Sequence, residues 1–166
     1  ALVTEVLDWG GTPWFSLVQA FKGCNNLTTF GTGTFSGNTG GVNLTSCFEN
    51  CTSLTSIDMR NWDLSNGSTM DSFAEECSVV TDVYLPALTP MKGSWESAFD
   101  AVGTAVTVGC AFNLEALDFT GSVGNNSLGL MFQSSRINPS SNFTNWVFGV
   151  GTEISSASMF RLTAIT

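Results

Sequence analysis

The side chains in this sequence that could do chemistry are carboxylates and thiols. The 166 residues include 14 Asp and Glu and five Cys, but histidine is absent. Histidine is the side chain used most often as a general acid or base, and it is also the commonest metal ligand. Any catalytic or metal-binding role would therefore fall to the cysteines and the carboxylates, and we expect no cofactor and no metal site.

Three of the cysteines share a position three or four residues after a phenylalanine. In a stacked repeat their Cα atoms would lie roughly 5 Å apart, within disulfide range, but their parallel side chains suit a disulfide poorly. A metal site is disfavoured because the sequence has no Cys-x-x-Cys pair. We expect a buried ladder of free thiols at Cys24, Cys51 and Cys77, with Cys47 also in the core and Cys110 the most exposed.

Two carboxylates are enough for glycoside hydrolysis when one of them has a raised pKa. Asp58, Tyr84 and Asp118 each fall at the outward position of a predicted strand, so we expect them on one exposed face as candidate ligand-facing residues. Asp58 and Asp118 would then lie about 10 Å apart, which approaches the separation in inverting glycosidases. The sequence offers no apolar pocket around either carboxylate, so catalysis is disfavoured and we expect no enzyme.

An internal repeat organises these residues. A phenylalanine recurs in a similar setting at intervals of 25 to 33 residues, at Phe21, Phe48, Phe73, Phe99, Phe132 and Phe160. Around each of them apolar residues lie three or four apart after a Ser, Thr or Asn, which predicts one or two capped helical turns. A unit of this size cannot bury its apolar face alone, so neighbouring units must stack around a common core.

Each helical segment is followed by a short strand pattern. Apolar residues at the spacing Leu-x-x-Leu-x-Leu occur over 54–59, 80–85 and 114–119, which is typical of a leucine-rich repeat. We therefore predict an α/β repeat, a leucine-rich-repeat-like solenoid with short parallel strands and short helical turns. Residues 1–13 would form a lead-in or cap and residues 14–166 five to six repeat units, as part of a longer chain.

The strings AFKGCNNLTTF and CFENCTSLTSIDMRNWDLSNGSTMDSF resemble the repeat of BspA-like leucine-rich repeat surface proteins. That repeat reads Met-Phe-x-x-Cys-x-x-Leu-x-x-Leu-Asp-Leu-Ser-Asn-Trp-Asp, and it also occurs in mycoplasma lipoproteins and marine phage virion proteins. The similarity is sharp over residues 14–85 and weaker beyond, where Val102 and Ser135 replace the cysteine. The resemblance implies an extracellular adhesion or recognition module without catalytic chemistry.

Composition limits the partners further. Five Lys and Arg against 14 Asp and Glu give a net charge of −9, which opposes binding to nucleic acid and to anionic lipid. No apolar run approaches the roughly 20 residues of a membrane helix, so we expect no membrane insertion. We expect a cell-surface glycan or protein receptor as the partner. Further chain or a partner subunit would cover the C-terminal end of the solenoid.

The function and location follow from the resemblance more than from any single motif. It favours a host-receptor-binding or adhesin part of a phage tail, fibre or other virion surface protein, which would be extracellular or on the virion surface. A bacterial cell-surface adhesin is the nearest alternative. A structural spacer or decoration domain without a ligand is a second alternative, and a glycan-cleaving enzyme is the least favoured.

Overall fold

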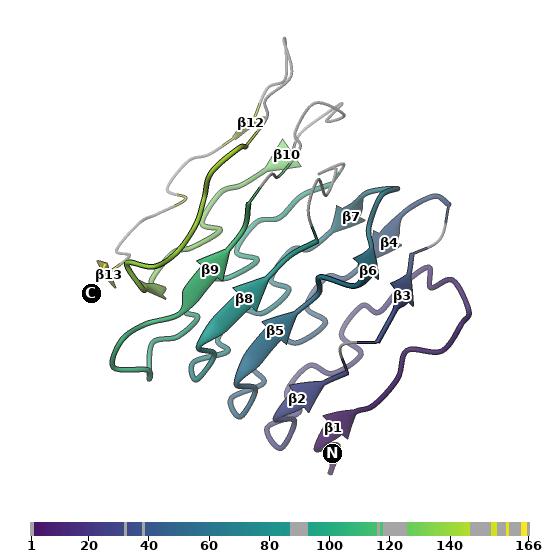
Figure 1. The fold of residues 1–166 in the computed structure, drawn as a ribbon, viewed down its shortest axis with the longest axis horizontal. Coiled ribbons are helices and arrows are strands. Elements are labelled where there is room, and N and C mark those ends of the chain that lie inside the picture. The colour runs from purple at the N-terminus through teal and green to yellow at the C-terminus, as the bar shows by residue number, and fades with distance from the viewer. Residues whose placement is uncertain are drawn as a thin grey trace.

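The chain winds into a parallel β-solenoid of about four turns in a computed structural model (Figure 1). The structure describes residues 2–31, 33–37, 39–86, 93–115, 117, 126–146, 154–155, 159 and 164–165. Strands of successive turns lie side by side, with β1 (Glu5–Val6) at one end of the stack and β13 (Ala164–Ile165) at the other. The predicted solenoid with short parallel strands is therefore confirmed.

The strands are two or three residues long, and all of their pairings are parallel. Pairing joins β1 to β2 (Thr29–Phe30) and joins β5 (Ser56–Asp58), β8 (Asp82–Tyr84) and β9 (Ala111–Asn113) into one sheet. It also joins β3 (Phe35–Ser36) to β6 (Trp62–Asp63) and β4 (Val42–Asn43) to β7 (Ser68–Thr69). Towards the C-terminus it joins β10 (Asn126–Ser127) to β12 (Ile154–Ser155) and β11 (Arg136–Ile137) to β13.

Within the described part of the chain, the segments around the repeated phenylalanines are not helical, so the prediction of short helical turns is wrong. In the second turn, the N–H groups of Glu49 and Cys51 donate to the carbonyls three residues back, as in consecutive β-turns. The N–H groups of Phe48 and Asn50 donate instead to carbonyls of the next turn of the solenoid, at 2.8 and 2.7 Å. Apolar residues three apart suit this arrangement as well as a helix, and the pattern alone does not separate the two.

These β-turns require left-handed backbone at residues that are mostly not glycine. Ser46 and Asn50 have φ values of 55° and 60°, and the same pair of positions recurs in the other turns of the solenoid. Each of them is the third residue of a β-turn, where a positive φ is typical of type II. Such a conformation costs of order 1 kcal/mol or more at a non-glycine residue. The hydrogen bonds from these residues to the next turn help to offset that cost.

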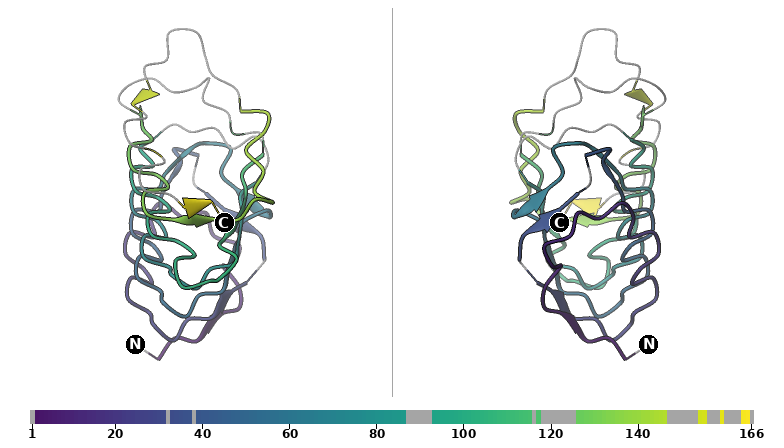
Figure 2. Two further views of the ribbon diagram at one scale, coloured as in Figure 1. Left: turned by 90° about the vertical axis from the view of Figure 1, so that its left-hand side faces the viewer. Right: turned by 90° about the vertical axis from the view of Figure 1, so that its right-hand side faces the viewer.

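The core is a column of apolar side chains inside the coil, whose turns nearly superpose in the end-on views of Figure 2. Phe48, Phe99 and Phe132 are fully buried, whereas Phe21 in the first turn is only partly buried; Phe160 lies outside the described residues. The hydrogen-bond register places Ala74, not Phe73, in line with Phe48. Phe73 is buried one position earlier, and its ring meets that of Phe48 edge-on at 86°.

The strand predicted over 114–119 is displaced in the structure. The strand that pairs with β8 is β9, which places Phe112 beside Val83 in the core. Leu114 and Leu117 are buried too, but they follow β9 instead of forming the strand. Counting back along the motif puts Gly109 where Val80 stands in the previous turn. Because Gly109 has no apolar side chain, the sequence pattern places the start of the motif at Leu114 instead of at Gly109.

Candidate functional site

The outward-facing residues of β5, β8 and β9 form the first candidate surface, which we call the strand face. Asp58 pairs with Tyr84, and Tyr84 pairs with Asn113; all three are partly exposed. The sequence motif placed Asp118 in this row, but the strand register gives Asn113 that place. Asp118 itself lies outside the described residues. The row Asp58, Tyr84 and Asn113 therefore carries one carboxylate, one phenol and one amide in adjacent strands, and Asp82 of β8 adds a second carboxylate to the strand face.

Arg60 joins the strand face and was missed by the sequence analysis. Its Nε and Nη2 atoms donate to Oδ1 and Oδ2 of Asp58 at 2.9 and 2.6 Å. Its Cζ atom lies 4.5 Å from the centre of the Tyr84 ring, a cation–π contact. The Asp-x-Arg spacing was the available signal, because outward residues two apart on a strand lie on the same face.

This geometry gives Asp58 a fixed charge. The hydrogen bonds from Arg60 lower the pKa of the Asp58 carboxyl below its ordinary value, so Asp58 stays ionised at neutral pH. A general acid needs the opposite shift. The strand face is thus suited to binding through an ion pair and an aromatic ring, more than to proton transfer.

The thiols lie in the core of the described residues. Cys24, Cys47, Cys51, Cys77 and Cys110 are all buried and unpaired with one another, so the expectation that Cys110 is the most exposed is wrong. The backbone N–H of Cys110 donates to the carbonyl oxygen of Arg136 in the next turn at 2.8 Å, and Cys110 has no exposed surface. Burial raises the pKa of Cys51 to about 11 and raises those of Cys47, Cys77 and Cys110 as well. Such thiols are poor nucleophiles.

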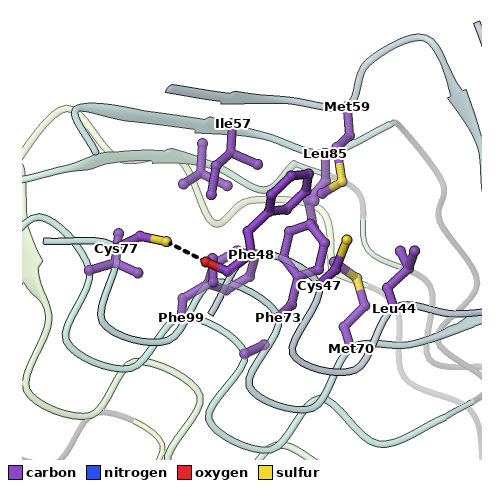
Figure 3. Close-up of a cluster of buried hydrophobic side chains, with 14 of the residues drawn as sticks. Leu44, Cys47, Phe48, Ile57, Met59, Met70, Phe73, Cys77, Leu85 and Phe99 are labelled. Atoms are coloured by element: carbon purple, nitrogen blue, oxygen red, sulfur yellow. Dashed lines mark hydrogen bonds between the residues drawn. The ribbon is translucent and has the colours of Figure 1, made fainter. Parts of the chain in front are cut away.

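Two of these thiols bond to backbone of the preceding turn. The Sγ atom of Cys51 donates to the carbonyl oxygen of Phe21, and that of Cys77 donates to Phe48 (Figure 3), each at 3.1 Å. Ser135 stands at the same repeat position, and its hydroxyl donates to the Phe99 carbonyl. The ladder therefore has a hydrogen-bonding role in holding neighbouring turns together.

A cavity of about 270 Å³ lies over β4 and β7, where the sequence analysis placed no site. It is lined by Phe15, Gly40, Gly41, Val42, Asn43, Asn66, Gly67, Ser68 and Thr69. None of these lining residues is charged, in a chain whose net charge is −9. The Gly-rich loops were visible in the sequence, but their meeting with Phe15 depends on the stacking of three turns.

A third group is acidic and lies on the turn segments. Burial, with the nearby Glu75 and Glu76 carboxylates, raises the pKa of Asp100 to about 6. On the same side Lys22 pairs with Glu49 at 2.7 Å. Within the described part of the chain, no group of three or more Cys, Asp or Glu side chains is placed to hold a metal ion.

The fold defines the chain as a parallel β-solenoid. Comparison with protein-family models, with curated proteins and with solved structures found no match to this chain. Among the described residues, no helix is long and apolar enough to cross a membrane.

Proposed function

We propose that this chain is an extracellular recognition module, the receptor-binding or adhesin part of a virion surface protein such as a phage tail or fibre. The observation that carries the proposal is the strand face, where Arg60 is held between Asp58 and Tyr84. A solvent-exposed arginine that is held by a carboxylate and an aromatic ring beside the sheet presents an oriented charge to a large ligand. The resemblance to BspA-like surface proteins supports the same function, including the alternative of a bacterial adhesin.

The proposed partner is a cell-surface glycan or protein, contacted through many polar groups. A rigid solenoid displays such groups at fixed spacing, so that weak contacts in successive turns can add. Further chain or a partner subunit at the C-terminal end remains part of the proposal, and most residues of that end lie outside the described ones.

Binding of the fluorescently labelled chain to intact bacterial cells tests this function. Arg60→Ala should weaken cell binding by about tenfold, the scale of one well-placed charged contact. Lys22→Ala is the matched control, because it also removes one cation and breaks one exposed ion pair, but on the turn segments instead of the strand face.

The control variant should bind as the unmodified chain does. Equal cell binding by all three proteins would show that the strand face does not contribute to binding. No binding to any of a broad panel of cells would favour the rival interpretation, a structural spacer or decoration domain.

A further inference from the structure

The cavity over β4 and β7 has the features of a small ligand site. Its volume of about 270 Å³ is just below the roughly 300–1,000 Å³ of pockets that enclose drug-sized ligands, so it suits a single ring. Three successive turns build it, because Ser16 next to Phe15 bridges to Asn43, and Asn43 pairs with Thr69. The site is therefore held by the solenoid's own backbone pairing.

Glycines let the two loops that line the cavity approach each other closely. Gly41 and Gly67 both have a φ of 90°, a left-handed conformation that side chains rarely adopt. A Cβ atom at Gly41 would lie 2.8 Å from the carbonyl oxygen of Gly67, so the two loops approach more closely than any other residue permits. The lining residues also include Asn43, Asn66 and Thr69, which carry amide and hydroxyl groups.

Phe15 supplies the apolar wall of the cavity, and it leaves a large apolar side chain in contact with water. Its side chain is 72% exposed although it is one of the largest apolar side chains in the chain, and the first turn does not bury it. Its backbone is held in place, since its carbonyl accepts a hydrogen bond from the Asn43 N–H at 3.1 Å. An exposed aromatic ring beside amide and hydroxyl groups offers a ligand one apolar surface and several hydrogen-bonding groups.

Asn43 is oriented for recognition. Its Oδ1 atom accepts a hydrogen bond from the N–H of Thr45 at 2.9 Å, a local turn that fixes the side chain. The amide nitrogen is then the end that a ligand can use. Fixed amide and hydroxyl groups beside an aromatic ring match a sugar, which has an apolar C–H face and a rim of hydroxyl groups.

We propose that this cavity binds a neutral sugar ring, whose C–H face packs on Phe15 and whose hydroxyl groups bond to Asn43, Asn66 and Thr69. The absence of charge among the lining residues favours a neutral sugar over a sialic or uronic acid, which the net charge of −9 would also repel. The proposal deepens the recognition function above and rests on it for its biological meaning. The site is separate from the strand face.

The test is a titration of the ¹⁵N-labelled chain with methyl glycosides of glucose, galactose, mannose and N-acetylglucosamine, followed by NMR. We expect at least one glycoside to shift the amide signals of Gly41, Gly67 and the Asn43 and Asn66 side chains, with a millimolar Kd. Phe15→Ala should weaken that binding by about tenfold, and Phe15→Tyr, which keeps the ring, should retain it. Leu7→Ala is the control, because Leu7 is 76% exposed but does not line the cavity.

Asn66→Ala gives a second measurement that does not depend on Phe15, since Asn66 is exposed and its loss should leave the fold intact. It too should weaken binding. The proposal is overturned if no glycoside shifts these signals, if the shifts lie elsewhere, or if Phe15→Ala and Asn66→Ala bind as the unmodified chain does. If both variants still bind cells, the sugar site is overturned but the recognition function stands. If a glycoside binds but the chain binds no cells, the sugar site stands and the recognition function is overturned.

Discussion

The thiol of Cys77 donates a hydrogen bond to the carbonyl oxygen of Phe48, 3.1 Å away on the preceding turn of the solenoid (Figure 3). Cys51 makes the same bond to Phe21, and Ser135 uses a hydroxyl in the same place. A buried carbonyl that lost this donor would be left less well satisfied. At Cys51, Cys77 and Ser135 the ladder position thus holds a small side chain that donates a hydrogen bond, whereas Val102 fills the same position without one.

Thiol reactivity tests the burial of this ladder. All five cysteines should be protected in the folded chain, including Cys110, and all five should react after denaturation. The reason is twofold, because burial blocks access to all five thiols and raises the pKa of Cys47, Cys51, Cys77 and Cys110. Labelling with a maleimide, followed by mass spectrometry, gives the count. Rapid labelling of Cys51 or Cys77 in the native chain would contradict the ladder.

Ser135 offers the sharpest test of the hydrogen-bonding role. Its hydroxyl donates to the Phe99 carbonyl and accepts from the N–H of Val102, and the residue is fully buried. Ser135→Ala should lower the free energy of unfolding by about 1–3 kcal/mol, because two buried backbone groups lose a partner. Ser135→Cys should recover part of it. The exposed Ser140→Ala is the control, and urea denaturation measures all three.

Phe48 tests the core register. It is fully buried between the rings of Phe21, Phe30 and Phe73, so Phe48→Ala should lower the free energy of unfolding by about 3–5 kcal/mol. Phe21→Ala, at the partly buried equivalent position in the first turn, should cost clearly less. Thermal unfolding of the two variants gives the comparison, and equal losses would argue against the assigned register.

Asp100 should make stability fall as pH rises. Its pKa is about 6 in the folded chain against 3.8 for the free side chain, so the folded state holds the proton more tightly. Stability from this group is present below about pH 4, is lost as pH rises towards 6, and stays lost above it. Asp100→Asn should therefore raise the melting temperature at pH 7 and change it little at pH 4.

The matched control for Asp100 is Glu5→Gln, which removes one negative charge at an exposed strand position. If both substitutions stabilise the chain equally, relief of the net charge of −9 explains the effect, and the burial of Asp100 does not.

The sequence pattern was sufficient for the solenoid but not for its turn segments. Stacking followed from the recurrence of Phe48 and its equivalents, since apolar residues at a fixed interval must share one core. The β-turns were missed because their apolar spacing equals that of a helix, and only the direction of the N–H groups differs. Phe73 was misaligned by one residue for a related reason, because Phe and Ala exchange adjacent core positions in that turn.

The two surfaces differ in how far a sequence could reveal them. Asp58 and Tyr84 were found because a strand places alternate residues on one face. Arg60 lies on the same face but follows the strand. The cavity joins Phe15, Asn43 and Asn66, which come from three turns, so no local pattern contains it. Asn113 replaced Asp118 because Gly109 hides the start of its motif.

In each turn segment the N–H groups alternate between a carbonyl of the next turn and a carbonyl three residues back. A single added residue between Ser46 and Asn50 would shift this alternation by one position. N–H groups that now bond to the next turn would then face their own β-turn, and the left-handed φ values would fall on different residues. Loss or duplication of a whole turn leaves this alternation of N–H groups unchanged. Chains of this kind should therefore gain or lose these turn segments only as whole turns.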